Sequence, residues 1–422
     1  MADSKFKPTR PRRLLLALDG VPHELITLAQ GRGLFENFNS PTRLLSPFPT
    51  MTNVALSAMF SASPPPGYES LYFDRDARAL RGGIRKYLGR RTPDKIPSSY
   101  MDELDYQEPL AFEFLIYVAA ETVWRSDMQR FRERFRAAPP NRDYFGFLKA
   151  TDGLLHSQGP DQLAIALESL DQILKEIQQV CGSETEILLF SDHGMNLREN
   201  TRSDLVTHLR RQGFKVGSNL VNGGNRAVSI PAFGLCSYAA AYCVGEDLIP
   251  KVAEALVDET GVDFTVYRDR SAVVINGREG SARIEQRTVN GDSFYRYITT
   301  NGDPLKLQHV SKKLRDEGRL DADGLGHDSA WFDSTHGHDY PDALSNIYAS
   351  LFRPRVRHTA DVLISLRDGY YFGWSPFGRI VRLAATHGNA QAPSSNAFMM
   401  STHRTLPECV RADNARTLLR GD

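Results

Sequence analysis

The chain has 422 residues, and its 51 lysine and arginine residues balance its 51 aspartate and glutamate residues. Hydrophobic residues make up 41% and aromatic residues 10%, which is enough apolar material for a sizeable core. This composition excludes a disordered chain and a protein built from membrane spans, and the zero net charge excludes a broad basic surface for nucleic acid. The net charge does not exclude an anionic substrate, because local clusters of charge vanish from a global sum.

The N-terminal segment gives an expectation about location. Its first 13 residues are polar and basic, and the apolar run at 14–18 has five residues. A secretory signal needs an apolar run of roughly 7–15 residues, and a bilayer span needs about 20. The four cysteines, at positions 181, 236, 243 and 409, form no C-x-x-C pair and are too few for a disulfide scaffold. We therefore expect a cytoplasmic protein with reduced thiols, and the sequence gives no evidence of binding to membranes or to nucleic-acid polymers. Its oligomeric state is left open.

Strand-like and helix-like patterns alternate along the chain. Short apolar runs predict buried strands, and apolar residues spaced three and four apart predict the helices that cover them. In chain order we expect a strand at 14–18, a helix at 23–30, a strand at 43–45, a helix at 53–60, a strand at 144–150, a helix at 161–180, a strand at 186–190, a helix at 203–212, and strands at 361–365 and 380–385. This order predicts an α/β fold with a mostly parallel sheet flanked by helices.

Two segments interrupt this order. Residues 80–140 are rich in charged and aromatic residues and include a helical stretch at 110–136. The second segment, 217–326, mixes strand patterns at 239–244, 264–267, 272–275 and 294–298 with a helix at 248–259. We therefore expect a catalytic core made of residues 1–216 and 327–422, with a helical insert at about 80–140. Residues 217–326 are expected to form an inserted α+β cap subdomain.

Aspartate and histidine residues follow several predicted strands. They are Asp19 in LLLALDG, Asp152 in YFGFLKATDG, Asp192 and His193 in ILLFSDHG, and His387 in IVRLAATHG. Ligands of open α/β sheets bind beyond the carboxyl ends of the strands, so these side chains should meet at one edge. His156 lies four residues after Asp152, or about one helical turn. A single aspartate after a strand is more often a helix N-cap, but several strand ends together predict a site for zinc or a similar divalent metal such as manganese.

A candidate nucleophile lies in the segment FPTMTNVA. Thr52 stands at the start of the predicted helix 53–60, where the helix dipole favours a phosphate group. A threonine hydroxyl is a weak nucleophile, but metal coordination can activate it. Taken alone, the position favours an ordinary threonine N-cap. Thr50 is the weaker candidate of the two threonines.

The segments LALDG, FPTMT, TDGLLHSQGP, SDHGM and ATHG together resemble motifs of the alkaline phosphatase superfamily, in the family's order. The resemblance is to the type I phosphodiesterase and nucleotide pyrophosphatase branch, and it extends from residue 14 to about 400. It implies an alkaline-phosphatase-like fold with two divalent metal ions, zinc or alternatively manganese. The implied ligands are Asp19, Thr52, Asp192 and His193 for one ion, and Asp152, His156 and His387 for the other. It also implies that Thr52 attacks phosphorus and forms a phospho-threonine that water hydrolyses.

The sequence departs from this family at three places, one of which is that Thr151 and Leu155 replace the proline and the glycine of its P-D-x-x-G-H motif. Thr52 is followed by Asn53 and Val54 rather than by F-P-N-H, and GYESLYFD lacks the asparagine that contacts phosphate in the family. Asn53 is therefore a candidate phosphate contact. His336 and His338 in STHGHD are alternative ligands to His387, which we favour because it follows a predicted strand.

The expected activity is hydrolysis of a phosphodiester or of a nucleotide pyrophosphate bond in a small-molecule substrate. A phosphomonoesterase, a phosphonate hydrolase or a phosphotransferase with the same metals is the alternative. A catalytically silent binding protein on the same fold is an alternative of another class. Such a protein would be expected to lack one or more ligands, whereas all seven ligand positions are filled here.

Overall fold

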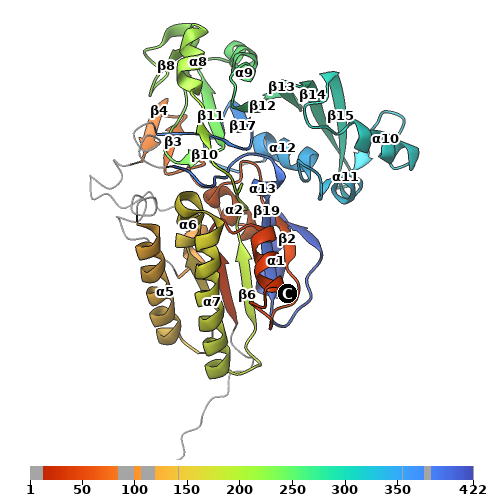
Figure 1. The fold of residues 1–422 in the computed structure, drawn as a ribbon. Helices are drawn as coiled ribbons and strands as arrows, with labels where there is room; N and C mark the ends of the chain where they lie inside the picture. Colours follow the sequence, from red (N-terminus) through yellow and green to blue (C-terminus); the bar gives the residue numbers. More distant parts are fainter. Residues whose placement is uncertain are drawn as a thin grey trace, which may run out of the picture.

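The computed structural model describes residues 13–83, 99–105, 119–140, 142–353, 355–374 and 382–421. It has two parts, each built around one large sheet (Figure 1). The lower part in this view contains a six-stranded sheet with the long helices α5 (Ala120–Ala137) and α7 (Pro160–Cys181) along one side. The upper part contains a nine-stranded sheet. Segments from both ends of the chain, coloured red and blue, lie together in the lower part.

The six-stranded sheet is mostly parallel. Its strands are β1 (Leu14–Leu18), β2 (Thr42–Leu45), β5 (Tyr144–Leu148), β6 (Ile187–Ser191), β19 (Asn396–Ser401) and β20 (Cys409–Arg411). They follow the order β20-β2-β19-β6-β1-β5, and within the described ranges only β19 runs antiparallel to its neighbours. The predicted α/β fold with a mostly parallel sheet is confirmed.

Helices cover both faces of this sheet. Alternate residues of β1 point to opposite faces, and all five are buried, which is why the strand is a continuous apolar run in the sequence. On the face of Leu14, Leu16 and Leu18 lie α1 (His23–Gly31), α5, α6 (Ala150–Gln158) and α7. On the face of Leu15 and Ala17 lie α2 (Thr52–Met59) and α14 (Ala415–Arg420).

The nine-stranded sheet forms the second part. Its strands are β8 (Lys215–Val216), β9 (Ala227–Ser229), β11 (Tyr238–Cys243), β12 (Val262–Asp269), β13 (Ala272–Gly277), β14 (Gly280–Val289), β15 (Asp292–Gly302), β16 (Gly326–His327) and β17 (Val362–Leu366). The order is β16-β15-β14-β13-β12-β17-β11-β9-β8. The segment 217–326 thus shares its sheet with β17, which lies between β12 and β11. The helices of this part are α8 (Leu205–Arg211), α9 (Ile249–Val257), α10 (Gln308–Asp316), α11 (Asp328–Thr335) and α12 (Ala343–Phe352).

Short elements complete the described structure. They are the hairpin β3 (Leu71–Asp74) and β4 (Ala79–Gly82), the strands β7 (Thr201–Arg202), β10 (Leu235–Cys236) and β18 (Tyr370–Gly373), helix α13 (Ala392–Ser395), and the 3-10 helices η1 (Tyr100–Asp102), η2 (Gly224–Arg226), η3 (Glu246–Leu248) and η5 (Ala412–Asn414).

Most of the predicted elements are found within a few residues of their expected bounds, with one exception near the C-terminus. In the segment 380–385, the described residues 382–385 form no strand; residues 380 and 381 lie outside the described ranges. The reason is that this backbone bonds to a helix and a loop rather than to a sheet, since Ala384 N donates to His156 O of α6 at 2.8 Å and Leu383 O accepts from Asn200 N at 3.1 Å. In the predicted helix 110–136, residues 110–118 lie outside the described ranges, and α5 covers the remainder.

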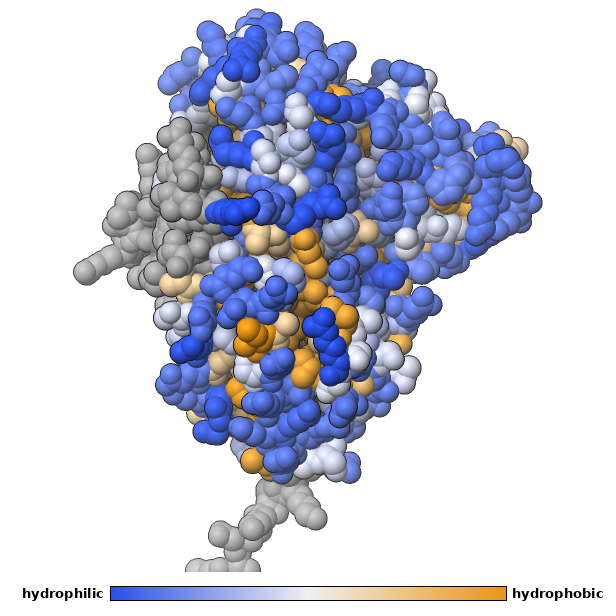
Figure 2. Space-filling view, in the orientation of Figure 1, coloured by the Kyte–Doolittle hydropathy of each residue, from blue (hydrophilic) through white to orange (hydrophobic). Residues whose placement is uncertain are grey.

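The surface in Figure 2 is mostly hydrophilic, with hydrophobic residues gathered over the lower part. Exposed large apolar side chains there include Leu28 of α1 and Ile165 of α7. In the described ranges, no helix combines the length and the apolar character that crossing a bilayer requires.

Candidate metal centre

The predicted ligands meet where β1, β5 and β6 end. Asp19 follows β1, Asp192 and His193 follow β6, and α6, the helix after β5, carries Asp152 and His156. Thr52 is the first residue of α2. His387 lies in the loop before α13. All six aspartate and histidine side chains are buried, and Thr52 is partly exposed.

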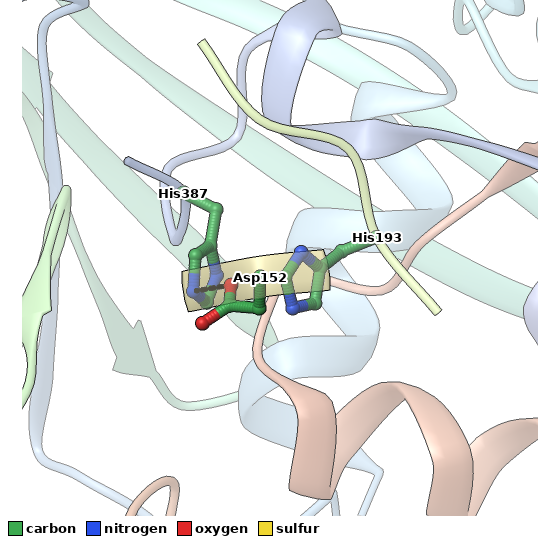
Figure 3. Close-up of side chains that lie close together, drawn as sticks. All are labelled: Asp152, His193 and His387. Carbon is green, nitrogen blue, oxygen red and sulfur yellow. Dashed lines mark ion pairs between the residues drawn. The ribbon is translucent and has the colours of Figure 1, made fainter. Parts of the chain in front are cut away.

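Three histidines face Asp152 or lie beside it. His156 Nε2 is 3.3 Å and His387 Nε2 is 3.5 Å from Asp152 Oδ1. The rings of His193 and His387 stack with centroids 3.8 Å apart (Figure 3). Asp152 Oδ1 is buried and accepts no hydrogen bond from the described residues. It is therefore a free ligand atom at the centre of a group of imidazoles.

The second half of the cluster contains Asp19, Asp192 and His193. His193 Nε2 lies 3.6 Å from Asp19 Oδ1 and 3.3 Å from Asp192 Oδ2. Gly20 N donates to Asp192 Oδ1 at 3.1 Å, but the buried Asp192 Oδ2 has no donor among the described residues. Thr52 Oγ1 lies 3.3 Å from both Asp19 Oδ1 and His193 Nε2. The Thr52 hydroxyl thus lies next to the half of the cluster that contains Asp19, Asp192 and His193.

Backbone carbonyl groups fix how the three imidazoles are oriented. The contacts are His156 Nδ1 with Ala385 O at 2.8 Å, His193 Nδ1 with Gly194 O at 3.0 Å, and His387 Nδ1 with Thr50 O at 2.8 Å. A carbonyl oxygen can only accept, so each Nδ1 carries a proton, and each ring in its neutral form turns the lone pair of Nε2 toward the carboxylates. Lone pairs facing carboxylate oxygens repel one another unless a cation lies between them. This orientation is typical of histidine ligands of metals.

Burial opposes charge on several of these groups. It raises the pKa of Asp192 to about 6 and, together with Asp192 and Asp152, raises the pKa of Asp19 well above its ordinary value. Burial also lowers the pKa of His193 to about 4 and, together with His193, that of His387 to about 3. Neutral imidazoles and carboxylates that need a positive partner are the groups that bind a divalent cation.

Asp152 and His156 shift each other's pKa in opposite directions. Burial alone would raise the pKa of Asp152, but His156 and His387 outweigh it and hold this pKa below its ordinary value. Burial alone would lower the pKa of His156, but Asp152 and the Ala385 carbonyl outweigh it and raise this pKa. Asp152 is therefore the carboxylate that stays ionised most readily.

The structure groups the predicted ligands differently from the two sets that the family resemblance implies. Among the predicted ligands, two sets bring their ligand atoms within 4.8 Å of one another, namely Asp19 with Asp192 and His193, and Asp152 with His193 and His387. His193 belongs to both sets, whereas the family resemblance implies a role in one. His336 and His338 belong to neither, since they follow α11 in the second part. The geometry therefore groups His387, and neither His336 nor His338, with the other predicted ligands.

Thr50 has a supporting role that the sequence did not indicate. Its side chain is fully buried, and Oγ1 accepts from Gly388 N at 2.8 Å and donates to Asn389 O at 3.3 Å. Its carbonyl holds the ring of His387. Thr50 thus fixes the loop that carries His387, and its hydroxyl is already engaged on both sides, unlike the more accessible hydroxyl of Thr52.

A partly buried carboxylate of the second sheet, that of Asp263 in β12, anchors the same loop. Gln391 Nε2 donates to Asp263 Oδ2 at 3.0 Å, and the Tyr340 hydroxyl donates to the same oxygen at 3.0 Å. Burial raises the pKa of Asp263 from 3.8 to about 6, although the bonds from Gln391 and Tyr340 oppose this rise. Because the pKa of Asp263 is higher in the folded state, protonation of this carboxyl group stabilises the fold. This stabilisation is complete below the ordinary pKa of 3.8 and is lost as the pH rises through about 6.

Asp263→Asn removes this titration, so the variant should gain stability relative to the wild type as the pH rises. Between pH 5 and pH 8 we expect the free energy of unfolding of the variant, relative to wild type, to rise by about 1–1.5 kcal/mol. Urea unfolding of both proteins at the two pH values measures this. In Tyr340→Phe the Asp263 carboxylate loses a hydrogen-bond donor that lowers its pKa. The free energy of unfolding should therefore fall more steeply as the pH rises. A stability difference between wild type and Asp263→Asn that does not change with pH would contradict the assignment.

Comparisons with known proteins find that the chain is similar to solved structures. No protein-family model matches the chain, and no curated protein is significantly similar to it. The structure of phosphonoacetate hydrolase from Sinorhizobium meliloti 1021 in complex with phosphonoformate is similar with a TM-score of 0.49 and 14% identity, over 97% of this chain and 95% of that chain. Human ectonucleotide pyrophosphatase/phosphodiesterase 5 is similar with a TM-score of 0.47 and 12% identity, over 97% of this chain and 94% of that chain.

Proposed function

We propose that this chain is a hydrolase of phosphoric esters that holds about two divalent metal ions and uses Thr52 as its nucleophile. The observation that carries the proposal is the position of the partly exposed Thr52 hydroxyl, 3.3 Å from Asp19 Oδ1 and His193 Nε2 of a buried cluster of aspartate and histidine. The motifs shared with the alkaline phosphatase superfamily occupy these same positions. Zinc fits this donor set of imidazoles and carboxylates, and manganese is the alternative.

The residues present fit two cations. Asp152 Oδ1 and Asp192 Oδ2 are buried oxygens without donors among the described residues, and a buried carboxylate needs a partner. Asp19, Asp192, His193 and Thr52 would hold one ion, and Asp152, His156 and His387 the other. When bound, a pair of divalent ions neutralises charge on the phosphoryl oxygens and lowers the pKa of the hydroxyl or water coordinated to it.

The chain supplies the nucleophile and its surroundings. Thr52 Oγ1 would give up its proton and attack phosphorus, so that the bond from phosphorus to the leaving oxygen breaks, the leaving oxygen takes up a proton, and a phospho-threonine forms. The attack is assisted by Asp19 Oδ1, which accepts the hydrogen bond of the hydroxyl before reaction. Water then attacks the same phosphorus, the bond to Thr52 breaks, and the hydroxyl regains a proton. Thr52 also stands at the N-terminus of α2, where the helix dipole favours an anion.

We further propose that the preferred substrates are phosphodiesters or nucleotide pyrophosphates, in a cytoplasmic setting. Turnover of bis(p-nitrophenyl) phosphate should exceed that of p-nitrophenyl phosphate when zinc or manganese is supplied, and chelation should abolish it. A preference for the monoester would favour a phosphomonoesterase. Cleavage of a phosphonate alone would favour a phosphonate hydrolase, and transfer to an added alcohol would show a phosphotransferase. Turnover that is unaffected by complete metal removal would contradict the proposal.

A further inference from the structure

Asn53 carries a hydrogen-bond donor next in sequence to the proposed nucleophile. It follows Thr52 in the first turn of α2 and is partly exposed. Its Oδ1 accepts a hydrogen bond of 2.7 Å from the Tyr100 hydroxyl. Among the described residues, no acceptor binds its Nδ2. The carboxamide is therefore fixed through its oxygen, and its NH₂ group is left for a ligand.

Tyr100 is itself held by packing. It lies in η1, and its ring packs against an apolar cluster that includes Phe60, Leu104 and Phe147. Phe60 in turn meets Phe145 and Phe190 edge-on, with ring centroids 6.1 and 6.3 Å apart. The hydroxyl of Tyr100 is thus supported from the core that also supports α2. A rigid support of this kind lowers the cost of orienting a side chain at a site.

A carboxamide suits the chemistry at this position. Negative charge on the nonbridging oxygens of a transferring phosphoryl group needs donors, and most side chains of the adjacent cluster are carboxylates or imidazoles without spare protons on Nε2. A neutral donor aimed at such an oxygen can contribute about 10²–10³-fold to turnover. If the carboxamide turned freely, its oxygen could instead face the phosphoryl group and repel it. The Tyr100 hydroxyl opposes this by engaging Oδ1.

We propose, resting on the phosphoryl-transfer function above, that Asn53 donates from Nδ2 to a nonbridging phosphoryl oxygen and that Tyr100 is the residue that positions it. Asn53→Ala should lower kcat about 10²-fold with a smaller change in KM. Tyr100→Phe, which keeps the ring but loses the hydroxyl, should lower kcat about five- to tenfold. In the double variant the tyrosine substitution should add almost nothing, because the two residues act as one unit.

The matched control is Tyr348→Phe. Its hydroxyl also donates to an oxygen, Ser271 O at 3.2 Å, but it lies in the second part of the molecule. This variant should turn over substrate within about twofold of wild type. If Tyr100→Phe retains wild-type kcat, or if its full effect persists in the Asn53→Ala background, the positioning role is wrong.

A second readout does not depend on turnover. In metal-loaded protein labelled with nitrogen-15 asparagine, orthovanadate should shift the side-chain NH₂ resonance of Asn53, which is assigned by its loss in Asn53→Asp. The shift should be smaller in Tyr100→Phe. If the enzyme hydrolyses phosphate esters but its Asn53 resonance does not shift when vanadate is added, this inference is wrong and the proposed function stands. A wild-type protein whose Asn53 responds to vanadate without any turnover would instead contradict the proposed function.

Discussion

Thr52→Ala is expected to lower kcat by about 10³-fold or more, because it removes the atom that forms the covalent bond to phosphorus. The structure gives the physical reason, since Thr52 Oγ1 is the hydroxyl that lies 3.3 Å from Asp19 Oδ1 and His193 Nε2. Rapid acid quenching followed by peptide mass mapping should detect a phosphorylated peptide in the wild type and none in the variant. Steady-state kinetics on the best diester substrate measures the loss of kcat.

Thr52→Ser is the matched control. It retains a hydroxyl at the same place and loses a methyl group, so a substantial part of the activity should survive. If Thr52→Ala keeps wild-type turnover, the nucleophile must be water or another side chain. Thr50 is then the next residue to test, although both sides of its hydroxyl are already engaged.

Asp152→Asn is expected to lower both the metal content and kcat, the latter by about 10²–10³-fold. This carboxylate has a buried oxygen without a donor, and His156 and His387 both face it. An amide is neutral and its NH₂ cannot bind a cation, so one ion should be lost. Elemental analysis should find about two divalent ions per wild-type chain and at most about one per variant chain.

Asp171→Asn controls for the loss of a buried carboxylate in general. Asp171 is also buried and accepts from Phe35 N at 2.9 Å, but it lies on α7 and belongs to neither ligand set. Its variant should keep about two ions. An Asp152→Asn protein that still binds two ions with wild-type affinity would show that Asp152 is not a ligand.

The sequence predicted which residues meet because two simple rules operate here. Buried parallel strands are continuous apolar runs, so Asp19 and Asp192 could be placed at strand ends, and a spacing of four put Asp152 and His156 on one side of α6. The sharing of His193 between two sets could not be predicted, because it depends on the stacking of its ring on His387. The carbonyl groups that orient the imidazoles are backbone atoms and leave no mark in the residue types.

The second sheet was harder to predict. Strand β14 mixes charged and apolar residues because it is only half buried, so it gives no apolar run. Strand β17 enters the sheet between β12 and β11 from a segment far along the chain. The bond between Tyr100 and Asn53 joins residues 47 positions apart and depends on how η1 packs on the core. Such long-range contacts follow from tertiary packing rather than from local pattern.

The stereochemical course at phosphorus tests the central claim, that Thr52 carries the phosphoryl group between two displacements. Each in-line displacement inverts phosphorus, so hydrolysis through a phospho-threonine has two inversions and a net retention. The measurement is hydrolysis of a chiral phosphorothioate diester in oxygen-18 water by the metal-loaded wild type, with the product configuration determined by phosphorus NMR. We predict retention. Inversion would show that water attacks the substrate directly and would contradict the covalent role of Thr52.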